Sequence, residues 1–116
     1  MRLYCIDAPE FDQRPWGREA RDHLRAITPG TVQVVAKRTQ YGTRDRHGRL
    51  VGEVFAGADG RSLNLEMVAS GQAAVYPRYC TEGRYFRMED VARRAGAGIW
   101  GRAGDQQRPW AHRRGG

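Results

Sequence analysis

The N-terminal stretch from Arg2 to Glu10 joins a pattern of alternating polar and apolar residues to a rigid corner. Its first half alternates as a half-buried strand does, and Ala8-Pro9 ends the alternation because proline cannot continue the hydrogen bonding of a strand. The stretch therefore predicts a strand with one carboxylate, Asp7, at its end and a second carboxylate just beyond a turn.

Three segments carry apolar residues at the three- and four-residue steps of a helix: 18–27, 64–70 and 82–95. Thr28-Pro29-Gly30 ends the first, and Asn64 is the predicted N-cap of the second. The predicted inward positions are Ala20, Leu24 and Ile27, then Leu65, Val68 and Ala69, then Tyr85, Met88, Val91, Ala92 and Ala95.

The other apolar segments are short and rich in β-branched residues, which favours strands. They cover 31–37, 50–56 and 73–76, and the polar stretch 38–49 is a predicted loop that places Arg49 directly before a strand. Trp100 is predicted to plug the core after the last helix. Strands mixed with helices in this order predict an α+β fold.

A chain of 116 residues supports one domain, which we assign to residues 1–101, followed by a polar tail at 102–116 that is predicted to be disordered. No apolar run suggests a membrane span or a signal peptide, so the sequence as written predicts a cytoplasmic protein, or a secreted one if a longer precursor exists. Two cysteines are too few for a disulfide framework, and two reduced thiols at Cys5 and Cys80 are predicted, with a single bridge as the alternative.

The net charge is +7, from 20 basic and 13 acidic side chains, and Lys37 is the single lysine of the sequence. Arginine binds phosphate bidentately and stacks on bases, so this composition suits a nucleic-acid partner. The alternative is a compositional bias that places arginines on a solvated surface. The summed charge still favours polyanions over acidic proteins or neutral substrates.

Three motifs stand in a specific order: Arg-Leu-x-x-Ile-Asp-Ala-Pro-Glu from Arg2, Asp45-Arg46-His47-Gly48-Arg49, and Gly98-Ile99-Trp100. Together, with helix-like segments between them, they resemble the staphylococcal nuclease family from Arg2 to about Trp100. The resemblance implies an OB-type β-barrel of five strands with three helices.

The sequence departs from that family at its beginning. In the family two strands precede the Arg-Leu motif, and the turn between them carries an Asp-Gly-Asp element that gives the metal a further carboxylate. Three alternatives stay open: a fragment of a longer nuclease, a sheet completed by a second copy in a homodimer, and a shortened, open barrel. Open sheet edges need covering in each of them.

The resemblance assigns roles to the motif residues. Arg2 and Arg49 are the expected phosphate clamps and Glu10 the expected general base, while Asp7 and the carbonyl of Ala8 are the expected ligands of Ca²⁺, which prefers hard oxygen donors. The alternatives are a turn residue for Asp7 and an exposed loop charge for Glu10.

Three further residues match family positions near the nucleotide. Arg46 and His47 correspond to positions that approach the terminal phosphate, and Tyr79 falls loosely where a tyrosine packs near the base. A loop aromatic that covers the barrel is the alternative for Tyr79.

The predicted function is a calcium-dependent nuclease that cuts DNA and RNA with little sequence preference. The alternative is an OB-type module that binds single-stranded nucleic acid without cutting it. A more distant alternative is a protein-interaction domain built from a degenerate nuclease barrel, against which the joint presence of Arg2, Asp7, Glu10 and Arg49 argues.

Overall fold

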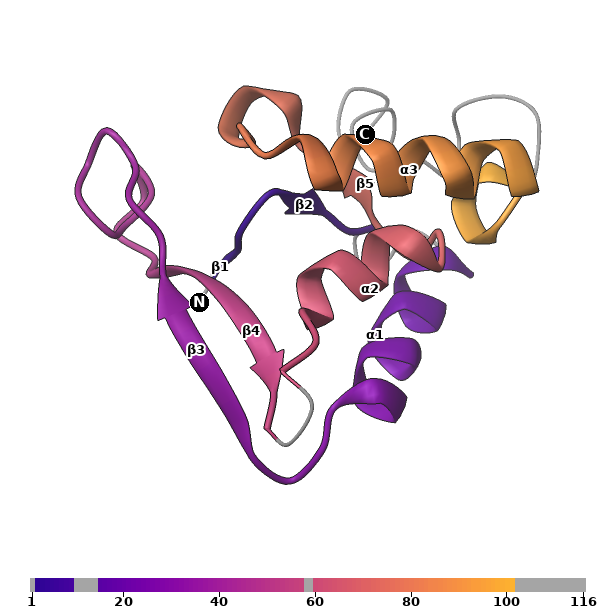
Figure 1. Cartoon of the computed structure of the whole chain (residues 1–116), viewed down its shortest axis with the longest axis horizontal. Coiled ribbons are helices and arrows are strands. Elements are labelled where there is room, and N and C mark those ends of the chain that lie inside the picture. Colours follow the sequence, from indigo (N-terminus) through magenta and orange to yellow (C-terminus); the bar gives the residue numbers. More distant parts are fainter. Residues whose placement is uncertain (1, 10–14, 58–59, 102–116) are drawn as a thin grey trace.

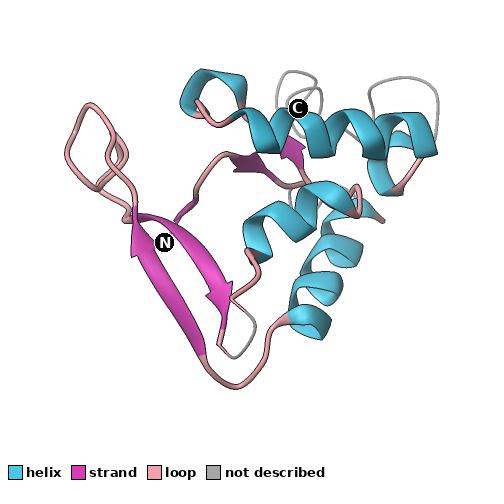
Figure 2. Cartoon of the chain, in the orientation of Figure 1, coloured by secondary structure: helices cyan, strands magenta, loops and turns pink. Residues whose placement is uncertain are grey.

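The structure of the protein is a computed structural model that describes residues 2–9, 15–57 and 60–101. Within these ranges the chain forms a three-stranded sheet, a two-stranded sheet, three α-helices and two short 3-10 helices (Figures 1 and 2). The predicted α+β class is confirmed. None of the described helices is both long and apolar enough to cross a membrane.

The three-stranded sheet is built around β4 (Val51–Ala56). β1 (Arg2–Leu3) lies parallel to it, with Leu3 opposite Gly52, and β3 (Val32–Ala36) lies antiparallel on the other side. β4 is almost entirely buried, whereas every residue of β3 is exposed.

The predicted closed barrel requires that the outer edge of β3 pairs with another strand. Val32, Val34 and Val35 are exposed large hydrophobic residues, and no described strand pairs with this edge. The described strands therefore form two open sheets, and a closed OB-type barrel is not present in this part of the chain. Completion of the sheet by a dimer partner stays a prediction.

The N-terminal segment joins the two sheets. The predicted first strand is divided into β1 and β2 (Ile6–Asp7), and β2 pairs antiparallel with β5 (Ala74–Val75) in the second sheet. Between β1 and β2, Cys5 has a φ angle of 67°, a left-handed conformation that turns the chain from one sheet to the other.

The prediction of two reduced thiols was wrong. Cys5 and Cys80 form a disulfide across a separation of 75 residues. Cys80 follows the 3-10 helix η1 (Pro77–Tyr79), which leaves β5 beside the β1–β2 turn. Two cysteines in a sequence do not reveal such proximity, because the pairing of β2 with β5 creates it.

The helices are α1 (Trp16–Ile27), α2 (Leu63–Ala69) and α3 (Gly83–Ala95), close to the predicted ranges. The N-cap of α2 is Ser62 rather than Asn64, because the hydroxyl oxygen of Ser62 accepts the hydrogen bond from the N–H of Leu65. The first helix stops at Thr28, as predicted.

The side chain of Asn64 is fully buried inside α2 and holds the sheet instead. Its amide group donates to the carbonyl oxygens of Tyr4 and Gly52, and its oxygen accepts from the N–H of Val54. One buried side chain thus binds three backbone groups, from the end of β1 and from β4.

The predicted inward stripes are correct in part. Tyr85 and Ala92 of α3 are buried, but Val91 and Ala95 are exposed and Glu89 is buried in their place. Ala69 of α2 is also exposed. The helices therefore bury shorter stripes than their patterns suggest.

The predicted core position of Trp100 is confirmed. It belongs to η2 (Gly98–Trp100) and packs with Ala74, Ala92 and Ile99. The η2 turn lies directly on the end of α2, where Ile99 donates to the carbonyl of Gly71.

Candidate functional site

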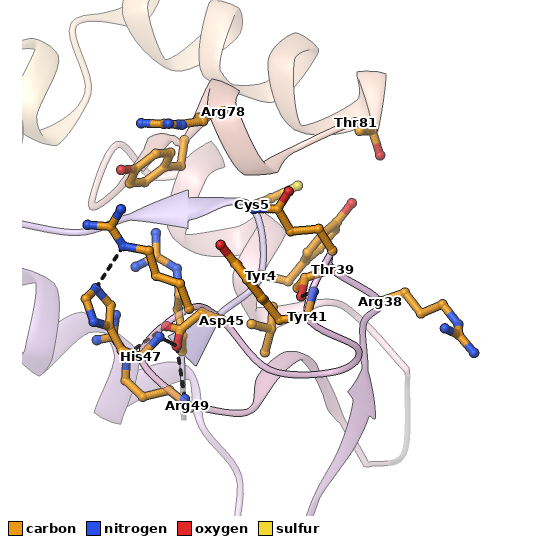
Figure 3. A pocket seen from close by; sticks show the side chains of 15 residues that line it. Tyr4, Cys5, Arg38, Thr39, Tyr41, Asp45, His47, Arg49, Arg78 and Thr81 are labelled. Carbon is orange, nitrogen blue, oxygen red and sulfur yellow. Dashed lines mark hydrogen bonds and ion pairs between the residues drawn. The ribbon is translucent and has the colours of Figure 1, made fainter.

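A pocket of about 600 Å³ opens between the N-terminal segment, the 38–49 loop and the η1 region (Figure 3). The described residues that line it are Arg2, Tyr4, Cys5, Arg38, Thr39, Gln40, Tyr41, Asp45, Arg46, His47, Arg49, Val51, Tyr76, Arg78 and Thr81. This set contains five arginines and one carboxylate, so the pocket is strongly basic and suited to an anionic ligand.

The structure brings four of the predicted site residues together. Arg2 comes from β1, and Arg46, His47 and Arg49 come from the loop before β4. The backbone N–H of Arg2 donates to the carbonyl of Leu50 at 2.7 Å, so pairing with the chain just before β4 fixes the second residue of the sequence.

The other predicted site residues are placed differently. Asp7 lies at the end of β2 and Ala8 follows it, and neither is among the residues that line the pocket. Glu10 and the side chain of Tyr79 lie outside what the structure describes. Their predicted roles stay predictions.

Asp45 organises the loop that carries the arginines. Its carboxylate accepts hydrogen bonds from the backbone N–H groups of His47 and Arg49 at 2.9 and 3.0 Å and from Nε of Arg49 at 2.8 Å. Desolvation raises the pKa of Asp45, but these hydrogen bonds and the charge of Arg49 together hold it below its ordinary value. The loop therefore presents Arg49 in a defined position while half of its side chain stays exposed.

Figure 3 shows the arginines at different edges of the pocket. Arg49 lies beside Asp45 on the loop side, and Arg78 lies at the opposite edge, where η1 forms the wall. Arg38 extends away from the other labelled side chains. A ligand in the pocket thus meets guanidinium groups from two walls, as a phosphate with several oxygens requires.

Tyrosines lie between these arginines. The guanidinium of Arg2 sits 4.9 Å from the ring centre of Tyr76, and the ammonium of Lys37 sits 5.1 Å from that of Tyr4. Tyr4 also meets the buried Tyr85 edge-on, with 5.9 Å between ring centres. Two cations are therefore positioned by aromatic faces near the pocket.

A buried carboxylate lies next to Lys37 and Tyr85. Glu53 of β4 is fully buried and accepts hydrogen bonds from Tyr85 and Arg84 at 2.6 Å and from Ser62 at 2.8 Å, while Lys37 lies 3.3 Å from its other oxygen. Burial raises the pKa of Glu53, but these hydrogen bonds and charges hold it below its ordinary value. The same burial and the bond to Glu53 raise the pKa of Tyr85.

Sequence reasoning missed the second wall. Tyr76 and Arg78 of this wall, and Tyr41 of the 38–49 loop, were not predicted as site residues, although another arginine or aromatic residue lies within three positions of each in the sequence. Interleaved arginine and tyrosine is the composition of a nucleic-acid-binding surface, and this signal was available in the 38–49 and 76–79 stretches.

The predicted calcium site depends on the oxygen donors of Asp7 and Ala8. Asp7 and Ala8 supply a carboxylate and a carbonyl, which are the kind of donor that Ca²⁺ takes, but Ca²⁺ needs about six to eight oxygens. In the described ranges no three histidine, cysteine, aspartate or glutamate side chains form a group that could hold a metal ion. These residues fit calcium in kind but not in number.

In its described part the chain is an α+β domain with a basic pocket lined by arginines and tyrosines, a composition suited to phosphodiester ligands. The profile of the staphylococcal nuclease homologues matches residues 1–102. The chain belongs to this family, and the prediction of a nuclease-type enzyme is confirmed at that level.

The region that aligns with this chain makes up different shares of its relatives. An uncharacterized endonuclease from Escherichia coli is 37% identical over 113 residues, which cover 97% of this chain and 69% of that protein. The staphylococcal-like nuclease CAN1 of Arabidopsis thaliana is 32% identical over 114 residues, 98% of this chain and 33% of the relative. A probable endonuclease of Paracoccidioides lutzii is 32% identical over 116 residues, 86% of this chain and 33% of the relative.

Proposed function

We propose that the protein is a calcium-dependent phosphodiesterase that hydrolyses DNA and RNA with little sequence preference. The observation that carries the proposal is the pocket whose described lining combines Arg2 and Arg49 with three further arginines and a single carboxylate. Family membership and relatives named as endonucleases support the same reaction.

The arginines supply the electrostatic part of the chemistry. Phosphodiester hydrolysis needs an attacking water, neutralisation of the charge that grows on the phosphoryl oxygens, and stabilisation of the leaving oxygen. Arg2 and Arg49 would clamp the phosphate, and Arg46 and His47 would contact a neighbouring phosphate. Because the guanidinium of Arg49 is already fixed by Asp45, little reorganisation is needed when the substrate binds.

The remaining roles rest on the motif. Glu10 would accept a proton from the attacking water, and Tyr79 would lie against a base. A calcium ion would add positive charge beside the phosphate, with the carboxylate of Asp7 and the carbonyl of Ala8 among its oxygen ligands. The donors in the described ranges are too few to hold the ion by themselves.

Low sequence preference follows from the kind of contact available. Guanidinium groups bind phosphate oxygens, which are the same at every nucleotide, and aromatic rings stack on any base. Among the described residues that line the pocket there is no asparagine and a single aspartate, and Gln40 is the one amide side chain among them. Selection between sequences is therefore expected to be weak.

The decisive test is cleavage of single-stranded DNA by the purified chain with calcium and with a chelator. Glu10→Ala should lower the rate by about 10²- to 10⁴-fold, as expected for loss of a general base. Asp90→Ala is the matched control, since Asp90 is an exposed carboxylate of α3 outside the pocket lining. Cleavage that survives the chelator and Glu10→Ala would overturn the proposal.

A second function is favoured by one observation, the position of Asp7 and Ala8 outside the pocket lining. In that case the same surface holds single-stranded nucleic acid without cutting it. Binding that weakens as salt rises, together with no cleavage under any metal condition, would support this module.

A further inference from the structure

Tyr41 stands out among the residues that line the pocket. Its side chain is 53% exposed, the largest value among the exposed large hydrophobic residues of the described chain. It lies in the 38–49 loop, within the same pocket as Arg46 and Arg49. An exposed aromatic ring beside several arginines is the combination on which proteins stack the bases of single-stranded nucleic acid.

The other described tyrosine rings of the pocket already have partners. Tyr4 carries Lys37 on its face and meets the edge of Tyr85, and Tyr76 carries Arg2. For Tyr41, the described residues provide neither a cation nor a second ring. Its aromatic surface is therefore left for a ligand.

The backbone that carries Tyr41 is held in place before any ligand arrives. The N–H of Tyr41 donates to the hydroxyl of Thr39 at 2.9 Å, and that hydroxyl donates to the carbonyl of Arg44 at 2.5 Å. Gly42 follows with a φ angle of 84°, and its carbonyl accepts from the N–H of Thr39. An ordered turn loses little conformational entropy on binding, so a stacking contact here retains most of its strength.

We propose that Tyr41 is a stacking platform for a nucleobase of single-stranded nucleic acid whose phosphates lie among the arginines of the pocket. The proposal rests on the proposed function for the class of ligand, and it adds the residue on which an unpaired base stacks. In a duplex the base faces are covered by neighbouring base pairs, so a ring that stacks on a base needs an unpaired nucleotide.

The test measures binding rather than cleavage. A fluorescein-labelled single strand of about ten nucleotides and a duplex of the same sequence are titrated by anisotropy in the presence of a chelator. Tyr41→Ala should weaken single-strand binding by about 5- to 100-fold, the range expected for one lost stacking contact. Tyr41→Phe should bind the single strand as the wild type does. The duplex should bind equally to the wild type and to Tyr41→Ala.

Phe86→Ala is the matched control, because Phe86 is an exposed aromatic residue of α3 that does not line the pocket. Thermal unfolding of each variant shows that the fold is kept. A change of less than about twofold in Tyr41→Ala, an equal loss on duplex, failure of Tyr41→Phe to restore binding, or a wild type that binds neither strand would each overturn the inference. Since the assay contains no free metal, absence of cleavage elsewhere leaves its outcome unaffected.

Discussion

Nε of Arg49 donates a hydrogen bond of 2.8 Å to Asp45, whose carboxylate also accepts the backbone N–H of the same arginine. One acidic side chain thus sets the loop and the guanidinium together. We expect Asp45→Ala to lower kcat/KM on single-stranded DNA by about 10- to 100-fold, because a phosphate clamp displaced by about 1 Å loses alignment with its substrate.

Steady-state kinetics check this expectation, with Asp22→Ala as the control. Asp22 also pairs with a neighbouring arginine, Arg21, but it lies on the exposed side of α1, away from the pocket lining. If Asp45→Ala kept the rate of the wild type, Arg49 would not need its fixed position.

Glu53 should matter to stability rather than to chemistry. Glu53→Gln keeps the shape but removes the charge that faces Lys37 and Arg84, and we expect a loss of about 2–4 kcal/mol in the free energy of unfolding. Urea unfolding measures this. The control Glu66→Gln removes the charge of a partly exposed partner of Arg61 and should cost less than about 1 kcal/mol. Equal losses in the two variants would contradict the buried role of Glu53.

The same carboxylate gives a pH dependence of stability. Because hydrogen bonds and cations hold the folded-state pKa of Glu53 below its ordinary value of 4.5, its contribution is fully present above that value and is lost as the pH falls through the lowered pKa. The wild type should therefore lose stability in this acid range more steeply than Glu53→Gln does.

Local patterns in the sequence predicted the elements well, because helical spacing and β-branched runs act within a few residues. The 18–27 helix and its stop at Thr28 are examples. Asn64 shows the limit: both it and Ser62 are good caps, and backbone groups of distant strands decide which one caps the helix. Open sheets and the exposed β3 likewise depend on which strands pair, and a local pattern cannot reveal that.

Local patterns likewise predicted one part of the candidate site and missed another. Arg2 and Arg49, which the motifs singled out, line one pocket because both lie beside the paired ends of β1 and β4, and their roles as phosphate clamps stay predictions. The wall formed by Tyr76 and Arg78 was missed, because it reaches the pocket through the pairing of β2 with β5 and through the disulfide. Contacts between segments about 70 residues apart have no signature in a single sequence.

The Cys5–Cys80 disulfide should hold these two walls together, because Cys5 lines the pocket and Cys80 lies between Arg78 and Thr81. We expect the double variant Cys5→Ser, Cys80→Ser to lose about 2–5 kcal/mol of stability, as for a closed loop of this length. Reductant should weaken the wild type and leave the double variant unchanged.

Chemical unfolding with and without reductant measures both effects. If the reductant released free thiols in the wild type without lowering its stability, the proposed role of the disulfide would be contradicted. The state of the bond in cells also tests the predicted cytoplasmic location, because cytosolic thiols are mostly kept reduced.

The phosphate clamps give the last prediction. Arg2→Ala and Arg49→Ala should each lower kcat/KM by about 10- to 150-fold, the loss expected when one charge-assisted hydrogen bond to the reacting phosphate is removed. Lysine at either position keeps the charge but not the two-pronged donor geometry, so Arg49→Lys should recover only part of the rate. Arg94→Ala is the control, since Arg94 pairs with Asp90 on α3 outside the pocket lining. Equal activity in Arg49→Ala and Arg94→Ala would mean that the pocket binds its anion without acting on it, because a clamp at the reacting phosphate cannot be removed without slowing the step it stabilises.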